Sequence, residues 1–156
     1  MIRLNRILYA TDFSDISLCA LPYAKSFARE YKAELHCIHV VDEAYQSWIA
    51  MSGEGLPIGP IVQEVLDTAE QQMKAFRSKH LSDIDTPVVT KIASGRPFME
   101  IIRYAREANV DLIVLATHGR SAIRQALIGG TAEKVVRKAP CPVLTIRHPE
   151  HEFVMP

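Results

Sequence analysis

The chain has 156 residues and 17.5 kDa, 48% of its residues are hydrophobic, and 18 basic residues balance 18 acidic ones. This length predicts one domain over residues 1–156, with a core large enough to fold without a metal or disulfide. The zero formal net charge argues against a dedicated nucleic-acid binder. Three cysteines, at 19, 37 and 141, lack the spacing of a zinc site or disulfide framework. The start carries no signal-peptide pattern and no apolar run reaches bilayer length, so we expect a cytoplasmic protein without a membrane partner.

The first half of the chain predicts two strands and one helix. Apolar residues 6–10, closed by polar ones, predict a strand buried on both faces. Ser14 is predicted to cap a helix in which Pro22 either causes a kink or lies in the first turn of the regular part. The inward stripe of that helix would be Ala20, Ala24, Phe27, Ala28 and Tyr31. Residues 34–41 predict a second strand. The Gly- and Pro-rich stretch 42–60 predicts an anchored surface excursion, with a functional or mobile connection as the alternative.

The second half continues the alternation. One helix is predicted over 61–76, with an inward stripe of Ile61, Val65, Leu66, Ala69, Met73 and Phe76. Residues 87–93 predict a strand near a sheet edge, because Pro87 opens it. A helix beginning near Pro97 would turn Phe98, Ile101, Ile102, Ala105 and Ala108 inward. A strand at 111–116, a helix at 132–138 and a strand at 143–146 complete the pattern.

Strands that alternate regularly with helices are typical of an α/β fold. We therefore expect a doubly wound open sheet of five parallel strands, with helices on both faces. In such sheets ligands bind outside the carboxyl ends of the strands, where the strand order reverses. The candidate loops are residues 10–14, the segment from 40 onward, residues 93–96 and residues 116–131.

The stretch 116–131 has the composition of a phosphate cradle. Gly119, Gly129 and Gly130 would let the backbone approach an anion, and the helix that follows would offer its first N–H groups and the Thr131 hydroxyl. Arg120 and Arg124 could reach phosphate oxygens. The alternative is a glycine-lined turn with solvated arginines. Neither a P-loop nor a Gly-x-Gly-x-x-Gly motif is present, which disfavours a dinucleotide dehydrogenase.

Four segments, taken in order and spacing, resemble the universal stress protein family from about residue 5 to residue 147. They are Ile7-Leu8-Tyr9-Ala10-Thr11-Asp12-Phe13-Ser14, His39-Val40-Val41-Asp42, Thr117-His118-Gly119-Arg120-Ser121, and Ala132-Glu133-Lys134-Val135-Val136 continuing into Ala139-Pro140-Cys141-Pro142-Val143-Leu144. The resemblance implies a Rossmann-like fold of the adenine nucleotide alpha hydrolase type and a regulatory protein of the stress response that binds ATP or AMP.

ATP-binding members of this family carry Gly-x-x-Gly, nine residues, then Gly-Ser/Thr. Gly119 and Gly129 match the second and third glycines, whereas Ala116 replaces the first and Gly130 stands where Ser or Thr is usual. The resemblance places Asp12 at the adenosine end and Val40 at the adenine. The nucleotide-binding residues that it implies are Ala10, Thr11, Asp12, Val40, Leu115, Ala116, His118, Gly119, Arg120, Gly129, Gly130 and Thr131. The alternative for Asp12 is a carboxylate that starts a helix, and for Val40 a plain core residue.

Catalysis is not assigned to any residue, and Mg²⁺ would enter only together with ATP. His36 and His39 are predicted to share one face of the second strand, which resembles ligand spacing; without a third ligand, core or interface histidines are favoured. The family resemblance implies a homodimer formed through Val143 to Ile146, because an apolar edge strand needs a partner, and an unknown regulatory protein partner. Three functional classes stay open: a nucleotide-binding regulator with slow or no hydrolysis, a weak Mg²⁺-dependent ATPase or related enzyme, and a nucleotide-free dimeric adaptor.

Overall fold

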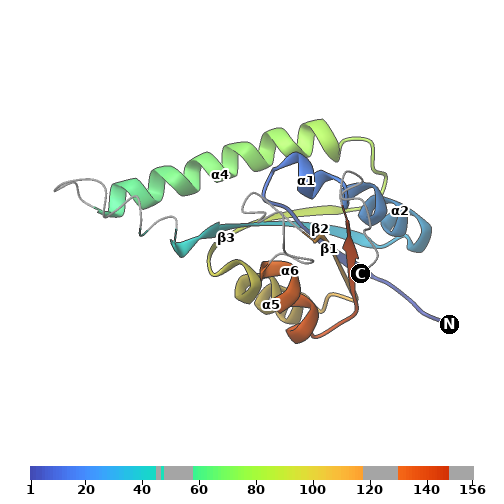
Figure 1. Ribbon diagram of the computed structural model, residues 1–156. Helices are drawn as coiled ribbons and strands as arrows, with labels where there is room; N and C mark the ends of the chain where they lie inside the picture. The colour runs from blue at the N-terminus through green and yellow to red at the C-terminus, as the bar shows by residue number, and fades with distance from the viewer. Residues whose placement is uncertain (45–46, 48–57, 118–129, 148–156) are drawn as a thin grey trace.

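The computed structural model describes residues 1–44, 47, 58–117 and 130–147, with residues 58–61 described by their backbone alone. Its centre is a sheet in the order β3-β2-β1-β4-β5, and every neighbouring pair runs parallel (Figure 1). The strands are β1 (Arg6–Ala10), β2 (Glu34–Asp42), β3 (Val88–Gly95), β4 (Leu112–Ala116) and β5 (Val143–Ile146). The predicted five-stranded parallel sheet is confirmed. β3 lies at an edge, as Pro87 indicated, and β5 forms the other edge.

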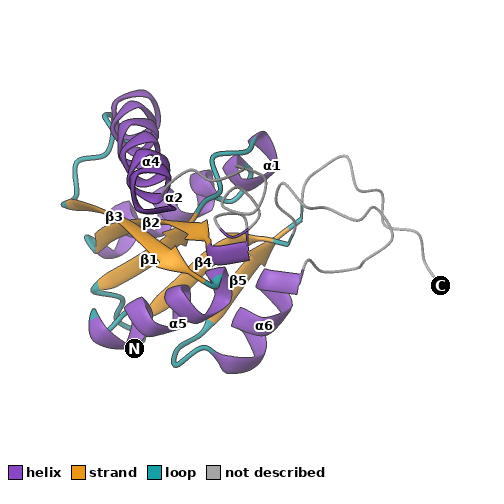
Figure 2. Ribbon diagram, turned by 90° about the vertical axis from the view of Figure 1, so that its left-hand side faces the viewer, coloured by secondary structure: helices purple, strands orange, loops and turns teal. Residues whose placement is uncertain are grey.

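Helices cover both faces of the sheet, as expected for a doubly wound fold (Figure 2). One face carries α1 (Asp15–Leu18), α2 (Leu21–Tyr31) and α4 (Ile58–His80), and the other carries α5 (Pro97–Glu107) and α6 (Gly130–Lys138). Successive strand residues alternate between two apolar clusters: Ile7 and Tyr9 face the first set of helices, whereas Leu8 faces α5 and α6. Burial on both sides explains why these strands read as continuous apolar runs.

The helix predicted after β1 is divided into two helices. Ser14 caps α1, and its Oγ accepts a hydrogen bond from Ser17 N at 3.2 Å. Pro22 lies in the first turn of α2, so it opens the helix rather than bending it. The prediction that Tyr31 faces inward is wrong, because Tyr31 is the last residue of α2 and is 39% exposed. The chain leaves the helix there through the left-handed Lys32.

The helix α4 is longer than the apolar stripe that predicted it, because it begins within the stretch 42–60 and continues to His80. Ala69, Met73 and Phe76 are buried as expected. Residues 45–46 and 48–57 of the predicted excursion lie outside the described residues. The helix α6 also begins two residues earlier than expected, so that Gly130 and Thr131 form part of its first turn. Within the described part of the chain, no helix combines the length and apolarity that crossing a bilayer requires.

Candidate functional site

A cavity of about 730 Å³ opens at the carboxyl ends of β1, β2 and β4. The chain passes from β1 outward to β3 on one side, and then returns to place β4 on the other side of β1. The strand order therefore reverses between β1 and β4, and the cavity includes this crevice. The beginnings of α5 and α6 close it on one face of the sheet, and α4 closes it on the other.

The structure brings eight of the predicted site residues to this cavity. They come from the ends of three strands and from the first turn of α6: Ala10, Thr11, Asp12, Val40, Leu115, Ala116, Gly130 and Thr131. His118, Gly119, Arg120 and Gly129 lie outside the described residues. The grouped residues are separated by up to 121 positions in sequence, from Ala10 to Thr131, so the parallel topology is what assembles them.

The corner between β1 and α1 is held by short-range hydrogen bonds. Asp12 Oδ1 accepts hydrogen bonds from Ser14 N, at 3.0 Å, and from Ser14 Oγ. Asp12 thus acts as a helix-initiating carboxylate and also borders the cavity. Its contact with adenosine stays a prediction. Thr11 Oγ1 accepts a hydrogen bond from Phe13 N and shares another with Ser17 Oγ at 2.9 Å. The corner therefore has a defined shape before any ligand arrives.

The first turn of α6 supplies the part of the cavity suited to an anion. The first N–H groups of a helix have no acceptor within the helix, and the helix dipole favours negative charge there. Glu133 does not oppose this, because its carboxylate pairs with Arg137 one turn further along, at 3.0 Å. A Cβ added at Gly130 would meet nothing within 4 Å. This end of the cavity can accept a phosphate or another small anion.

The face of the sheet toward α5 gives the cavity its apolar wall. Val40 packs against the cluster that α5 and α6 build with the sheet, and Leu115 in the same cluster is 4% exposed. Ile101 of α5 and Ala132 of α6 line the cavity beside them. An apolar slot next to a helix N-terminus can hold a flat heterocycle and an attached anionic group.

Two parts of the cavity were not predicted from the sequence: the wall that α4 forms, and His39 on β2. Glu64, Thr68 and Gln72 line the cavity four residues apart on α4. The four-residue spacing of these polar side chains was readable, but the apolar stripe alone does not show that α4 extends over the cavity. Further lining residues absent from the prediction are Ser17, Ile38, His39, Val41, Asp42, Val65, Ala69, Pro97, Ile101, Thr117 and Ala132.

The two histidines of β2 do not share a face, and that prediction is wrong. Residues three apart in a strand point to opposite sides. His36 contacts Tyr104 on the α5 side, whereas the ring of His39 stacks on Phe13 with centroids 4.2 Å apart. His39 Nδ1 lies 2.9 Å from the Thr11 carbonyl oxygen, at the cavity. In the described segments, no group of three or more His, Cys, Asp or Glu side chains is arranged to hold a metal ion.

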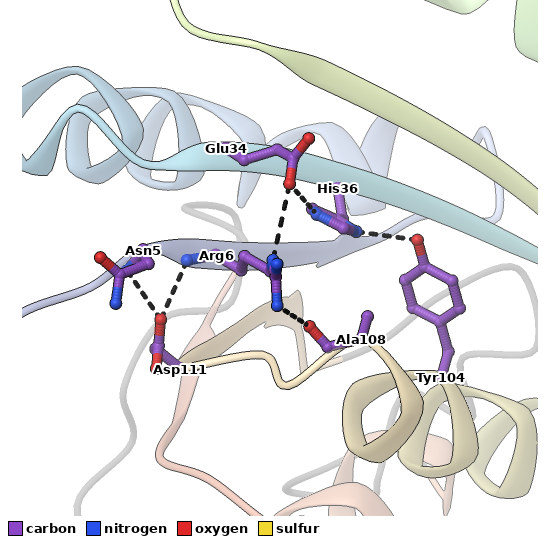
Figure 3. A network of polar contacts seen from close by, with 7 residues as sticks. All are labelled: Asn5, Arg6, Glu34, His36, Tyr104, Ala108 and Asp111. Atoms are coloured by element: carbon purple, nitrogen blue, oxygen red, sulfur yellow. Dashed lines mark hydrogen bonds and ion pairs between the residues drawn. The ribbon is translucent and has the colours of Figure 1, made fainter.

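His36 belongs to a separate polar network at the amino ends of the strands (Figure 3). Its Nδ1 lies 2.8 Å from the Tyr104 hydroxyl and its Nε2 lies 3.0 Å from Glu34 Oε2. Glu34 also faces Arg6, whose Nη1 donates to the Ala108 carbonyl oxygen at 2.9 Å. This network ties β1, β2 and α5 together, and none of its side chains lines the cavity. The contacts of His36 are those of a buried histidine with a structural role.

A profile described as "Universal stress protein family" matches residues 3–147. The chain belongs to the universal stress protein family. A curated relative, Universal stress protein MJ0531 of Methanocaldococcus jannaschii, is 32% identical over 148 residues, which cover 95% of this chain and 85% of the relative. The fold and the family thus agree with the resemblance that the four sequence segments carry.

Solved structures of family members share the architecture. MJ0577 of Methanocaldococcus jannaschii, whose structure was a test case of structural genomics, superposes with a TM-score of 0.81 at 27% identity, over 94% of this chain and 98% of that one. UspA from Lactobacillus plantarum gives a TM-score of 0.77 at 29% identity, over 94% and 100% of the two chains. These likenesses cover the sheet and the helices on both of its faces.

Two more distant structures hold nucleotides. A universal stress protein in complex with cAMP is 24% identical with a TM-score of 0.60, over 94% of this chain and 98% of that chain. The universal stress protein from Archaeoglobus fulgidus in complex with dAMP is 21% identical with a TM-score of 0.56, over 93% and 98%. At these identities the likeness establishes a common fold.

Proposed function

We propose that this universal stress protein binds an adenine nucleotide, ATP or AMP, in the cavity at the β1–β4 crevice, and that occupancy regulates its action in the stress response. The observation that carries the proposal is the meeting of the Thr11–Asp12 corner, the Val40 wall and the Gly130–Thr131 helix start in one cavity. The two complexes with cAMP and dAMP support the choice of an adenine nucleotide at the level of the fold.

Each part of the nucleotide has a suitable surface. The base would lie against Val40 and Leu115, the sugar hydroxyls would reach the Asp12 carboxylate, and the phosphates would lie at the start of α6. Ala116 adds one methyl group near the proposed sugar position, and Gly130 lacks the hydroxyl usual in the family's ATP-binding motif. Because both departures remove or crowd contacts to the sugar and phosphates, we expect moderate affinity rather than none.

Equilibrium dialysis with labelled ATP and AMP, each with and without Mg²⁺, tests the proposal. Saturable binding at or below millimolar nucleotide, weakened by Asp12→Asn and unchanged by Tyr104→Phe, supports it. Tyr104 lies in the amino-end network, so it is a matched control outside the cavity. No saturable binding at millimolar nucleotide contradicts the proposal and leaves the nucleotide-free adaptor.

We propose that hydrolysis is slow or absent; turnover would require a side chain that positions the attacking water and a group that neutralises the developing charge. Analysis of the dialysis samples for ADP and phosphate after long incubation tests this. Intact ATP is expected. Mg²⁺-dependent phosphate release that Arg120→Ala abolishes would instead identify a weak ATPase.

We further propose that β5 pairs with β5 of a second copy. Pro142 and Ile146 accept hydrogen bonds through their carbonyl oxygens from Ile113 N and Thr117 N, next to β4. By alternation, the backbone groups of Val143 and Thr145 face the outer edge of the sheet. This edge carries no charged side chain, whereas the other edge strand exposes Lys91.

Sedimentation of Thr145→Pro tests the pairing. The substitution removes an N–H from the outer edge and leaves the ladder to β4 intact, so a shift from dimer to folded monomer is expected. Thr90→Pro on β3 is the control at the opposite edge, because by the same alternation the N–H of Thr90 faces away from β2. A wild-type monomer, or a Thr145→Pro dimer, would contradict pairing through β5.

A further inference from the structure

We propose that His39 and Phe13 are positioning residues that together hold the Thr11–Asp12 corner in the shape that receives the nucleotide. This inference rests on the proposed function, since Asp12 is the residue whose carboxylate the corner presents to the cavity. Neither His39 nor Phe13 belongs to the glycine motif. Both lie where the carboxyl ends of β1 and β2 meet.

The contact between His39 and β1 fixes the orientation of one peptide group. His39 Nδ1 lies 2.9 Å from the Thr11 carbonyl oxygen, and a carbonyl oxygen accepts hydrogen bonds only. Nδ1 therefore carries the hydrogen, in the neutral and in the protonated ring alike. The carbonyl that His39 holds belongs to the peptide bond between Thr11 and Asp12. The direction in which the Asp12 side chain leaves the backbone thus depends on this bond.

Phe13 holds the other side of the corner in an uncommon backbone conformation. Its φ is +63°, in the left-handed region that glycine and asparagine adopt far more readily than phenylalanine. This turn brings the Phe13 ring onto the His39 ring, with centroids 4.2 Å apart and planes at 27°, and against Phe76 at 5.6 Å. A strained residue of this kind persists when its surroundings determine its conformation. Here the stacked His39 ring is part of those surroundings.

Backbone and hydroxyl contacts complete the clamp. Thr11 N donates to the Ile38 carbonyl oxygen at 3.0 Å, and Phe13 N donates to Thr11 Oγ1 at 3.0 Å. Ser17 Oγ lies 2.9 Å from Thr11 Oγ1 and donates to the Ser14 carbonyl oxygen at 2.8 Å. Every residue from 11 to 14 is therefore tied to β2, to α1 or to its neighbour. Such pre-organisation lowers the cost of ordering the site when a ligand binds.

The test compares variants that each remove one of the two contacts, the His39 hydrogen bond or the stacking of Phe13 on His39. His39→Leu keeps apolar bulk but removes the donor, and His39→Asn keeps a donor attached to Cγ but removes the ring. Phe13→Leu keeps the apolar contact and the strained φ but removes the stacking. Leu81→Val is the control for a general loss of core packing, because Leu81 is 3% exposed in the same apolar cluster and does not line the cavity.

Dissociation constants for AMP and ATP are measured by calorimetry, together with amide hydrogen exchange without ligand. We expect His39→Leu to raise the dissociation constant about tenfold, equivalent to about 1.4 kcal/mol, and His39→Asn to restore it to within about threefold. Phe13→Leu should raise it by a few fold and speed exchange at the Phe13 and Ser14 amides. Leu81→Val should lower the melting temperature and leave both readouts at the corner unchanged.

The outcomes separate this inference from the proposed function. If the wild type binds and His39→Leu binds equally well, or if His39→Asn gives no rescue, the positioning role is overturned. If the wild type binds neither nucleotide, the proposed function fails, and amide exchange alone decides the positioning role. The positioning role is then supported if His39→Leu selectively speeds amide exchange at Phe13 and Ser14. It is overturned if Leu81→Val speeds exchange there equally.

Discussion

His36 and His39 lie three residues apart on β2 and differ in nearly every physical respect. His36 is 5% exposed, and both of its ring nitrogens bond side chains, those of Tyr104 and Glu34. His39 lies on the opposite face, bonds a backbone carbonyl and lines a cavity. At the amino ends of the strands the polar contacts join β1, β2 and α5. At the carboxyl ends they hold the backbone that borders the cavity.

The largest effect is expected from truncating the histidine at the amino end. The Glu34 carboxylate can only accept, so His36 Nε2 donates to it, and in the neutral ring Nδ1 accepts from the Tyr104 hydroxyl. His36→Ala leaves the Tyr104 hydroxyl without this partner, leaves Glu34 paired with Arg6 alone and opens a cavity, so the free energy of unfolding should fall by about 3 kcal/mol. Urea denaturation measures it. Tyr104→Phe, which removes one hydroxyl, should cost about 1 kcal/mol.

A second prediction is that the amino-end network and the cavity are independent, so that His36→Ala leaves the nucleotide affinity of the folded protein unchanged. We expect an unchanged dissociation constant at a temperature well below the transition, because the His36 network contributes no side chain to the cavity. A tenfold loss of affinity would mean that the two ends of the sheet are coupled.

Alkaline pH should lower the free energy of unfolding through two buried groups of the hydrophobic core, Cys37 and Tyr9. Burial raises the pKa of the Cys37 thiol from 9.0 to about 12, and burial also raises the pKa of Tyr9 above its usual 10.0. In each case the folded state holds its proton more tightly than the unfolded chain, so the stabilisation is complete below pH 9 and is lost as the pH rises. The free energy of unfolding should fall by about 2 kcal/mol between pH 7 and pH 10.

Urea titrations at several pH values test this expectation. Cys37→Ala should remove most of the loss between pH 9 and pH 10, whereas Tyr9→Phe should flatten the curve only near and above pH 10. Stability that stays constant to pH 10 in the wild type would show that these groups titrate alike in both states.

At the carboxyl end, Asp12→Asn should alter binding without altering the fold. An asparagine side-chain oxygen can still accept from Ser14 N, so stability should change by less than about 0.5 kcal/mol. The charge that the proposed sugar contact uses is lost, and the dissociation constant for AMP should rise about tenfold. Calorimetry and thermal melting on the same samples separate the two effects. A matched loss of stability and affinity would assign Asp12 to the fold alone.

The smallest effect is expected at Gly130, where the chain departs from the family's usual Ser or Thr. A Cβ here meets nothing within 4 Å, so Gly130→Ser fits without rearrangement and adds a hydroxyl at the start of α6. ATP affinity should improve about threefold, with a gain of a few tenths of a kcal/mol in stability. Calorimetry with ATP measures the first. Weaker binding than the wild type would place the phosphates elsewhere.

The parts of the site that could be predicted are those that topology alone assembles. Parallel strands bring the loops after residues 10, 40 and 116 to one edge of the sheet, whereas the family resemblance names Asp12 and Val40 within them, and the anion site before α6 stays a prediction. Alternating strands and helices were sufficient for the fold, because buried parallel strands have continuous apolar runs.

The rest of the site could not be predicted, because it depends on backbone conformation and on where helices end, which the spacing of apolar residues does not indicate. The left-handed φ of Phe13 brings its ring to His39, and no apolar pattern signals such a turn. Thr68 lies within the predicted helix, but the apolar stripe does not show that this part of α4 borders the cavity. Tyr31 matched the helical spacing but lies at the end of α2, where the chain turns away from the core.

Titration of AMP into ¹⁵N-labelled protein, followed by amide chemical shifts, shows directly where on the sheet the nucleotide binds. We expect the largest changes at Thr11, Asp12, Ala116, Gly130 and Thr131, and no change at Arg6, Glu34 and Asp111 at the opposite end. Saturating shifts confined to the amino-end residues, or no shifts at millimolar AMP, would contradict a nucleotide site at the carboxyl ends of β1 and β4.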